Sequence, residues 1–542
     1  MPFWSRANKH AGLNRPFPPS KRLELLGERK ITGDNEQTVA VMRDLFDKND
    51  DLSTRTIDIL GHYQASVLYL SNFVDNARLH QDVLKPLMET NTSSLAVKRA
   101  NVIQFILKQV LSYGEAYVET SLNKIGEALF RGNTILLIQD LKEAIVVSTR
   151  SVDHRTPSQP ETEQAIRGAR DGFIESIGVN MSLIRYRLQT PDLRMESMEL
   201  GRLTKTKVAV CYIEGLVDPD VVRRVRERLK KIDIDSVLDA GTLEQFIEDN
   251  HWSPFPQIQN SERPDKSCAA LLEGRVVILT DGTPFALIAP TTFTQFYQVM
   301  DDYTERWIMG SLVRGVRLVS LFFSLVFPSL YVAVISFNPE LIPTKFAVAV
   351  AGGRAGVPFP AVIEVLIMEI SMEVLREATL RLPQQVGGAL SIVGVLVVGQ
   401  AAVSAGFVSP ITVVVVALTT IGSFATPAYN AAIALRILRF ALILLAGTFG
   451  LYGIVIGMIL IFNHMLALRS FGVPFWSPYA PFKGQGMKDA PIRAPLWSLY
   501  LRPKELSPQN DRRISEETVA YAKSPPNRQR RTIISGPRKG GQ

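Results

Sequence analysis

Metal ligands, cofactor-binding loops and nucleophile motifs are missing from this sequence, and each absence excludes a class of site. The chain has two cysteines, Cys211 and Cys268, too few for a disulfide framework and without metal-ligand spacing, so both thiols are expected to be reduced and structural. The histidines are scattered and form no closely spaced pair, and no glycine-rich phosphate loop or nucleophile elbow is present. The sequence therefore predicts no enzyme, no bound metal and no organic cofactor.

An apolar leader is also missing near the N-terminus. The segment Met1 to Arg22 is polar and contains several prolines and arginines, but no apolar core. We therefore expect no cleavable signal peptide and a cytosolic location for the soluble part of the chain. Arg314 and Arg317, which precede an apolar run, are then expected on the inner side of a membrane, where basic residues accumulate.

Charged residues are absent from one long interval. Between Leu382 and Leu435 there is no Asp, Glu, Lys, Arg or His. About 20 apolar residues span a hydrocarbon layer of about 30 Å, so this interval is long enough for two crossings with a break at Ser409-Pro410. Two further apolar runs, Leu318 to Phe337 and Phe440 to Phe462, flank it. The pattern predicts an integral membrane protein with four spans.

One apolar segment of this region, Ala361 to Ala378, carries charges. They are Glu364, Glu369, Glu373, Arg376 and Glu377. At about 100° per residue four of them share one stripe of a helix, and Glu364 lies opposite. The helix could lie at the membrane interface, pack in a protein core with paired charges, or line water. These residues are accordingly candidates for an ion path or for contacts between subunits.

The number of crossings depends on this charged helix. If it does not cross, four spans return the basic C-terminal segment to the inside; if it crosses, five spans bring Arg376, Arg381, Arg436 and Arg439 inside instead. We favour four full crossings and an interfacial or re-entrant helix at 361–378, because the C-terminal segment is the larger basic block.

That C-terminal segment holds the whole net charge. Residues 483–542 contain 13 Lys and Arg against 5 Asp and Glu, which equals the +8 of the entire chain. Its richness in Pro, Ser, Asn and Gln predicts a disordered basic tail from residue 482. The tail is either solvated at the inner face or in contact with anionic lipid. Nucleic-acid binding is not expected, because no aromatic platform accompanies the charge.

The region before the spans contains two related halves. Tyr69 to Asp75 follows an apolar strand and leads into a helix, and Tyr212 to Asp218 does the same 143 residues later. A hairpin follows in each half, at an offset of about 141 residues. Asp75 and Asp218 are expected to cap helices rather than to catalyse. Gly215 and Gly282 are expected to adopt turn conformations that disfavour other residues.

These features predict an α/β soluble region of two related subdomains joined by helices, followed by an α-helical transmembrane domain and a disordered basic tail. The expected regions are a disordered N-terminal segment (1–34), a first α/β subdomain (35–150), a helical connector (151–204), a second α/β subdomain (205–305), a transmembrane domain (306–481) and the tail (482–542).

A glycine-containing loop interrupts the connector. Its charged residues are Arg167, Arg170 and Asp171. It is either a linker between packed subdomains or a contact between subunits. Arg185, Arg187 and Arg194 are expected to extend a basic surface beside it, where they could pair with acidic neighbours.

Several motifs together resemble the GerA family, the A-type subunits of bacterial spore germinant receptors. Those that carry the resemblance are Val357 to Glu364, Met368 to Pro383, Arg167 to Ser176, Tyr212 to Asp218, Asp281 to Phe285, Phe327 to Tyr331 and Ser470 to Pro474. The similarity runs from about residue 35 to 481. Ala169 and Asp171 depart from the proline and glutamate of the family pattern, which leaves the contacts of that loop open.

The resemblance implies a protein of the spore inner membrane that acts with a transporter-like B subunit and a C-type lipoprotein. It implies a homo-oligomeric, nutrient-gated ion channel formed by this subunit, with the nutrient bound by the complex and with membrane lipid around it. A non-conducting scaffold subunit, or a paralogue of the stage V sporulation protein AF type, is the alternative.

Overall fold

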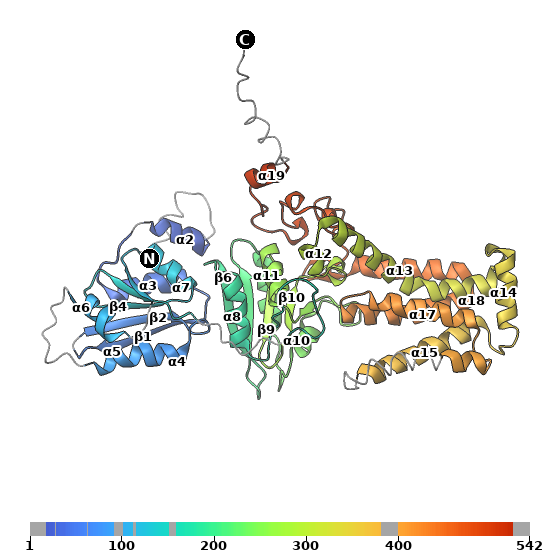
Figure 1. Ribbon diagram of the computed structural model, residues 1–542, viewed down its shortest axis with the longest axis horizontal. Coiled ribbons are helices and arrows are strands. Elements are labelled where there is room, and N and C mark those ends of the chain that lie inside the picture. The colour runs from blue at the N-terminus through green and yellow to red at the C-terminus, as the bar shows by residue number, and fades with distance from the viewer. Residues whose placement is uncertain are drawn as a thin grey trace, which may run out of the picture. The chain divides into compact units, whose positions relative to one another are not determined.

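The computed structural model describes residues 18–27, 29–61, 63–90, 101–111, 115–150, 159–380 and 399–523. The chain forms two compact units (Figure 1). Unit 1 comprises Met1–Glu248, Asn260–Pro290 and Leu506–Asp511; unit 2 comprises Asp249–Gln259, Thr291–Glu505 and Arg512–Gln542.

Unit 1 begins with a five-stranded antiparallel sheet. Its strands are β1 (Leu52–Ile59), β2 (Tyr63–Leu70), β3 (Ala116–Glu119), β4 (Thr134–Ile138) and β5 (Ala144–Val147), in the order β1-β2-β4-β5-β3. One apolar layer lies under α2 (Pro19–Leu26), α3 (Asn35–Leu45) and α7 (Leu122–Phe130), and the other under α4 (Asn76–Arg78), η1 (Leu79–Leu84), α5 (Lys85–Glu89), α6 (Val102–Phe105) and η3 (Ile106–Val110). The strands β4 and β5 are buried throughout because helices cover both faces.

A second five-stranded sheet has the same design. Its strands are β6 (Leu193–Leu200), β7 (Thr206–Ile213), β8 (Gln259–Ser261), β9 (Val276–Thr280) and β10 (Ala286–Ala289), in the order β6-β7-β9-β10-β8. Its helices are α8 (Ile177–Arg187), α9 (Pro219–Lys230), α10 (Ala240–Ile247) and α11 (Pro264–Glu273). When the strands of each sheet are numbered 1 to 5 along the chain, both sheets have the order 1-2-4-5-3. This identity confirms the predicted duplication.

The two helix-capping aspartates also have their predicted roles. The Asp75 carboxylate accepts a hydrogen bond from the backbone N–H of Arg78, at 3.0 Å, and Asp218 accepts one from Asp220, also at 3.0 Å. Each occupies the N-cap of a helix, where a carboxylate satisfies otherwise unpaired N–H groups.

The connector expected at 151–204 differs from the prediction. Residues 151–158 lie outside the described residues, and 159–176 contain no helix or strand. After helix α8 the chain enters strand β6, which pairs with β7 over eight residue pairs and belongs to the second sheet. The expectation of a mainly helical segment was wrong because residues 193–200 form hydrogen bonds with β7 and adopt a strand.

Unit 2 is a helical bundle preceded by the short turns η4 (Phe293–Phe296) and α12 (Asp301–Thr304). Its helices are α13 (Trp307–Phe337), η5 (Pro339–Leu341), α14 (Thr344–Arg354), α15 (Ala361–Leu380), α17 (Pro410–Phe424) and α18 (Tyr429–Ala467). A small two-stranded sheet, β11 (Arg469–Ser470) and β12 (Val473–Pro474), follows.

Two helices among the described residues, α13 and α18, are long and apolar enough to cross a membrane, fewer than the four to five spans expected. Pro410 and the Ser409 N-cap start α17, and Phe424 ends it after 15 residues. At 1.5 Å per residue α17 extends only about 22 Å, short of the roughly 30 Å hydrocarbon layer. Most of the other expected span lies outside the described residues.

Helix α18 folds back on itself at Gly450, where the backbone leaves the helical region (φ 62°, ψ −141°). A Cβ on Gly457 would lie 2.4 Å from the Leu442 side chain. In a straight helix those residues would be about 22 Å apart. We therefore describe a first arm (429–449) and a second arm (451–467), and the predicted span 440–462 is not one straight helix.

The charged helix α15 lies inside this bundle, where it contacts α13, α17 and α18. Its residues meet the first arm of α18 in antiparallel order: Val362 lies at Gly447, Glu369 at Arg439 and Glu373 at Arg436. Of the three arrangements considered for this helix, the packing supports a protein core with paired charges, and whether the helix is also interfacial or re-entrant remains a prediction.

The segment expected to be a disordered tail is folded as far as residue 523. It contains the turns η6 (Gly486–Lys488), η7 (Leu496–Ser498) and η8 (Lys504–Leu506), followed by α19 (Glu516–Lys523). Ala490, Arg493 and Leu499 are buried. The prediction of disorder was wrong for this part because it rested on the basic composition. The segment nevertheless contains enough apolar and aromatic residues to pack. Residues 524–542 lie outside the described residues.

Candidate functional site: buried charges among the helices of unit 2

Glu364, at the start of α15, is completely buried and bound from three sides. Its carboxylate accepts hydrogen bonds from Arg354 Nε at 3.1 Å, from the backbone N–H of Ser409 at 3.0 Å and from Thr412 Oγ1 at 3.0 Å. Ser409 is the N-cap of α17, so the negative charge lies at the positive end of that helix. Glu364 therefore caps a neighbouring helix and ties α14, α15 and α17 together.

Glu369 pairs with Arg439 across the bundle. The two side chains are 2.8 Å apart, and their exposed fractions are 1% and 2%. Glu369 Oε1 and Arg439 Nε and Nη2 have no hydrogen-bond partner among the described residues. The pair is therefore isolated from water, and removing either member would leave an uncompensated charge.

The C-terminal half of α15 brings a second carboxylate beside two arginines. Glu373 contacts Arg376 at 2.8 Å and Arg436 at 3.5 Å, and it remains 31% exposed. Arg376 also donates to Ser423 Oγ at 3.2 Å and lies over the Phe424 ring. Glu377, the last residue of the predicted set, is exposed.

The outward face of α15 is apolar. Its exposed side chains before Glu377 include Ile363, Ile367, Ile370 and Val374, which recur at helical spacing. The structure thus turns Glu364 and Glu369 toward the protein interior, whereas Glu373 and Glu377 reach the surface near the end of the helix. An ion-path or intersubunit role for these residues remains a prediction.

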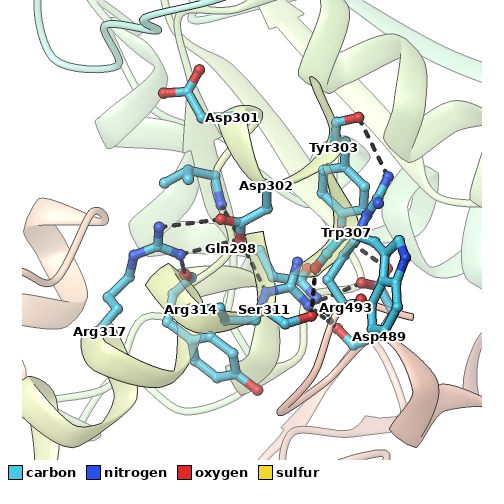
Figure 2. Close-up of polar contacts among 12 residues, drawn as sticks. Gln298, Asp301, Asp302, Tyr303, Trp307, Ser311, Arg314, Arg317, Asp489 and Arg493 are labelled. Atoms are coloured by element: carbon cyan, nitrogen blue, oxygen red, sulfur yellow. Dashed lines mark hydrogen bonds and ion pairs between the residues drawn. The ribbon is translucent and has the colours of Figure 1, made fainter. Parts of the chain in front are cut away.

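A second charged cluster lies at the start of α13 (Figure 2). The guanidinium of Arg314, fully buried, contacts Asp302 at 3.0 Å and Asp489 at 2.9 Å. Arg317 donates to both carboxylate oxygens of Asp302 at 3.2 Å. These two arginines are not free charges but bind acidic residues from α12 and from the C-terminal segment, and their expected place on the inner side of a membrane remains a prediction.

Contacts around Tyr303 complete this cluster. Its hydroxyl donates to Asp489 at 2.9 Å, and the guanidinium groups of Arg314 and Arg493 lie 5.6 and 5.8 Å from its ring centre. Ser311 Oγ, one turn into α13, donates to the backbone carbonyl of Arg493 at 2.8 Å. The cluster fixes residues 489–493 to the beginning of α13. Sequence reasoning missed it; the available signal was a single aspartate within a strongly basic segment.

The predicted intersubunit loop lies in unit 1. Arg167 and Arg170 are exposed, whereas Asp171 forms an ion pair with Arg187 of α8. Arg263 also contacts the loop and donates a hydrogen bond to the backbone carbonyl of Ala169, at 3.0 Å. A contact between subunits at this loop remains a prediction.

Arg185 and Arg194 do not belong to the basic surface expected around this loop. Arg185 is buried against Asp51 at 2.8 Å, and Arg194 is buried against Glu214, also at 2.8 Å. Arg194 additionally donates to the carbonyl of Leu45, at 3.3 Å. Arg185 pairs with an acidic residue of the first half, whereas Arg194 pairs with Glu214 within the second half and reaches the first half only through Leu45, so neither contributes to an exposed basic surface.

The two thiols lie in the apolar core of the second sheet. Burial raises the pKa of Cys211 and of Cys268 to about 12, which keeps both protonated and weakly nucleophilic at neutral pH. Within the described residues no group of three or more His, Cys, Asp or Glu side chains is arranged to hold a metal ion.

Comparison with known proteins yields relatives over most of the chain. The family model described as Bacillus/Clostridium GerA spore germination protein matches residues 40–505, past residue 481, where the resemblance was expected to end. Spore germination protein KA of Bacillus subtilis (strain 168) is 44% identical over 464 residues, 85% of each chain. The uncharacterised membrane protein YfkQ of the same organism is 41% identical over 490 residues, 90% of this chain and 94% of YfkQ.

One solved structure is also similar. It is the crystal structure of the N-terminal domain of the A subunit of the Bacillus megaterium spore germinant receptor GerK3. The sequences are 32% identical, and the match covers 49% of this chain and 98% of that domain with a TM-score of 0.39.

Proposed function

The chain belongs to the GerA family of spore germination proteins, and from this premise we propose that it is the membrane subunit of a nutrient germinant receptor and forms the receptor's ion channel as a homo-oligomer. It acts in the spore inner membrane with a transporter-like B subunit and a C-type lipoprotein, and its unit 1 lies on the cytosolic side. Nutrient bound by the complex shifts a closed ensemble to an open one through unit 1.

The observation that carries this proposal is the construction of α15. A helix with five charged side chains lies in an apolar bundle, and its deepest carboxylates are compensated within the same chain. Copies of the subunit can therefore meet along the apolar face of α15 without burying an unpaired charge. No charge has to be supplied by a neighbour.

In such an oligomer the face made by Ile363, Ile367, Ile370 and Val374 surrounds the central path. A narrow apolar ring excludes water and closes a channel until the helices separate. At the end of this ring Glu377 supplies negative charge that attracts cations, and Glu373 beside it is balanced by Arg376 and Arg436. This assignment divides the predicted ion-path residues into an outer acidic pair and an inner structural pair.

The channel is tested by recording currents from the purified full chain in a planar bilayer. We expect a cation conductance that falls when Glu377 is changed to Gln, while oligomer yield on a sizing column stays the same. Glu364→Gln is the matched control, since its carboxylate caps α17, and it should lower the yield of folded protein without changing cation selectivity. Equal effects of both variants on selectivity would contradict the division.

A non-conducting scaffold is the second candidate, and the completeness of the ion pairs inside one chain favours it. A scaffold needs only apolar outer faces for assembly, which α15 provides. Intact oligomers that carry no current, with or without the partner subunits and nutrient, would support the scaffold and would also fit a stage V sporulation protein AF-type role.

A further inference from the structure

The C-terminal segment of unit 2 combines a fixed backbone with exposed apolar side chains. Asp489 and Arg493 attach it to α12 and α13 through the contacts around Tyr303. Nevertheless Phe482 is 73% exposed, Ile492 57% and Leu496 56%. Large apolar side chains that a fixed segment directs outward are typical of a surface that meets an apolar partner.

The position of this segment along α13 indicates what the partner is. Ser311 Oγ donates to the backbone carbonyls of both Trp307 and Arg493, at 2.7 and 2.8 Å, so the backbone next to Ile492 lies at the first turn of α13 (Figure 2). Trp307 and Ile308 are exposed as well. The first exposed apolar residues of α13 and those of the C-terminal segment therefore lie at the same end of the helix.

From this end the exposed face of α13 continues as an uninterrupted apolar stripe. Leu312, Val316 and Val319 are each at least 60% exposed, as expected for side chains that face lipid tails. Tryptophan at the start of such a helix is typical of the boundary between headgroups and acyl chains. The C-terminal segment thus lies at the depth of that boundary.

The charge of the segment fits the same partner. Residues 482–505 contain five basic residues, of which Lys504 is exposed and Lys483 partly exposed. One of its two acidic residues, Asp489, is already bound by Arg314. The remaining positive charge attracts anionic headgroups, and the apolar side chains can enter the layer beneath them.

We infer that residues 482–505 form an interfacial collar, a membrane-seating surface that rests on the anionic headgroup layer around the start of α13. The collar deepens the proposed function and rests on the membrane-spanning role of α13. The contacts of Asp489 with Arg314 and Tyr303, here called the clamp, fix the collar to α12 and α13. The collar thereby sets the depth of α13, the first helix of the proposed channel, relative to the lipid surface.

Site-directed labelling of the full chain in lipid nanodiscs tests the collar. Leu496→Cys carries an environment-sensitive fluorophore, and the buried native cysteines Cys211 and Cys268 remain unlabelled under mild conditions. Nanodiscs contain anionic phospholipid with a nitroxide near the headgroup or, for the Val319 reference about 18 Å further along α13 than Trp307, in the middle of an acyl chain. Val319→Cys on α13 is the lipid-facing reference, and Leu203→Cys in unit 1, 80% exposed, is the reference for water.

We expect the nitroxide lipid to reduce the fluorescence at Leu496→Cys to about half, as for a group at the headgroup boundary, and to leave Leu203→Cys unchanged. Replacing the anionic lipid by a zwitterionic one should weaken the effect. Adding Asp489→Asn, which loosens the clamp, should weaken it further while Val319→Cys remains quenched.

Two results would overturn the collar while leaving the channel proposal intact. A Leu496→Cys label that behaves like the water reference removes the lipid contact. A label shielded from both water and lipid, with disulfide-linked dimers of Leu496→Cys on a gel, assigns the surface to a second copy of the chain. Failure of the acyl-chain nitroxide to quench Val319→Cys would instead remove α13 from the membrane, and with it both proposals.

Discussion

The two sheets of unit 1 are alike in their turns and different in their buried charges. Their strand orders match, and so do the residues with left-handed backbone conformations 142 positions apart: Gly132 and Gly274 end corresponding helices, and Asp140 and Gly282 lie in corresponding hairpins. The two halves therefore share the backbone conformation at these turns and helix ends, although the residues at the hairpin position differ. The repeated backbone depends on those few positions.

The buried arginines show no such symmetry. Arg185 and Arg194 belong to the second half, and Arg185 reaches Asp51 of the first half. The contact continues through the Asn49 side chain, which accepts from the backbone N–H of Met195 at 3.1 Å. The two halves therefore share their strand order, but the contacts at the boundary between them are asymmetric. Here the Arg185–Asp51 ion pair and the hydrogen bond to Asn49 join the two halves within unit 1.

Asp51→Ala should have the largest effect on this comparison, because it removes the charge partner of Arg185 at the boundary. Breaking one side of a buried ion pair costs about 3–5 kcal/mol. The free energy of unfolding of unit 1 is measured by pulse proteolysis of the full chain in urea. Asp47→Ala, at an exposed position of the same loop, is the control. A loss at Asp51 no greater than at Asp47 would show that the boundary does not depend on this pair.

Gly132→Ala and Gly274→Ala test the matched helix ends and should differ. Both residues have positive φ, 86° and 95°. A Cβ on Gly132 would also lie 2.7 Å from the Phe73 ring, whereas on Gly274 the nearest atom is a carbonyl oxygen at 3.3 Å. We expect the free energy of unfolding to fall by about 2–4 kcal/mol for Gly132→Ala and by about 1–2 kcal/mol for Gly274→Ala in the same assay. Equal losses would mean that φ alone sets the cost.

Gly282→Val should have a smaller effect, confined to the β9–β10 hairpin. Gly282 has φ 85°, and its surroundings leave room for a side chain, so strain in the backbone is the main cost, about 1–2 kcal/mol. Receptor abundance in spores should fall more than nutrient preference changes. Gly282→Asp, which copies Asp140 of the first half, should lose less. Normal abundance with altered preference would contradict a structural role.

The smallest expected effect is a pH dependence of stability that only the second half shows, and it comes from Glu244. The corresponding position of the first half, 142 residues earlier, is Val102, which does not titrate. Burial, assisted by Glu248, raises the Glu244 pKa from 4.5 to about 7. The folded state then binds the proton more tightly, so stability is full below pH 4.5 and declines as pH rises through about 7. Glu244→Gln should remove this decline in urea unfolding curves at several pH values. An unchanged slope would exclude Glu244 as its source.

Local sequence patterns were sufficient for the repeated soluble fold. The offset between Tyr69 to Asp75 and Tyr212 to Asp218 predicted two related subdomains, and the N-cap roles of Asp75 and Asp218 followed from their positions before helices. Such features depend on neighbours a few residues away, so the sequence displays them directly. The connector failed because strand β6 takes its pairing partner from residues further along the chain.

The bundle shows the limit of the same reasoning. Apolar composition identified the membrane region, but not the reversal at Gly450 or the short α17, since a run of apolar residues does not state where a helix bends. Likewise the tail was assigned by its basic composition. Packing of residues such as Ala490 and Leu499 depends on contacts that composition does not describe.

By itself the sequence determined the membrane character, the duplicated α/β design, the family resemblance and the presence of five charged residues in one apolar helix. Only the tertiary structure decided where those charges lie: Glu364 on the N-terminus of α17, Glu369 against Arg439, and Asp489 of the supposed tail against Arg314. The physical reason is that the free energy of a buried charge depends on the partner within a few ångströms, and those partners lie 45 to 175 residues away in the chain.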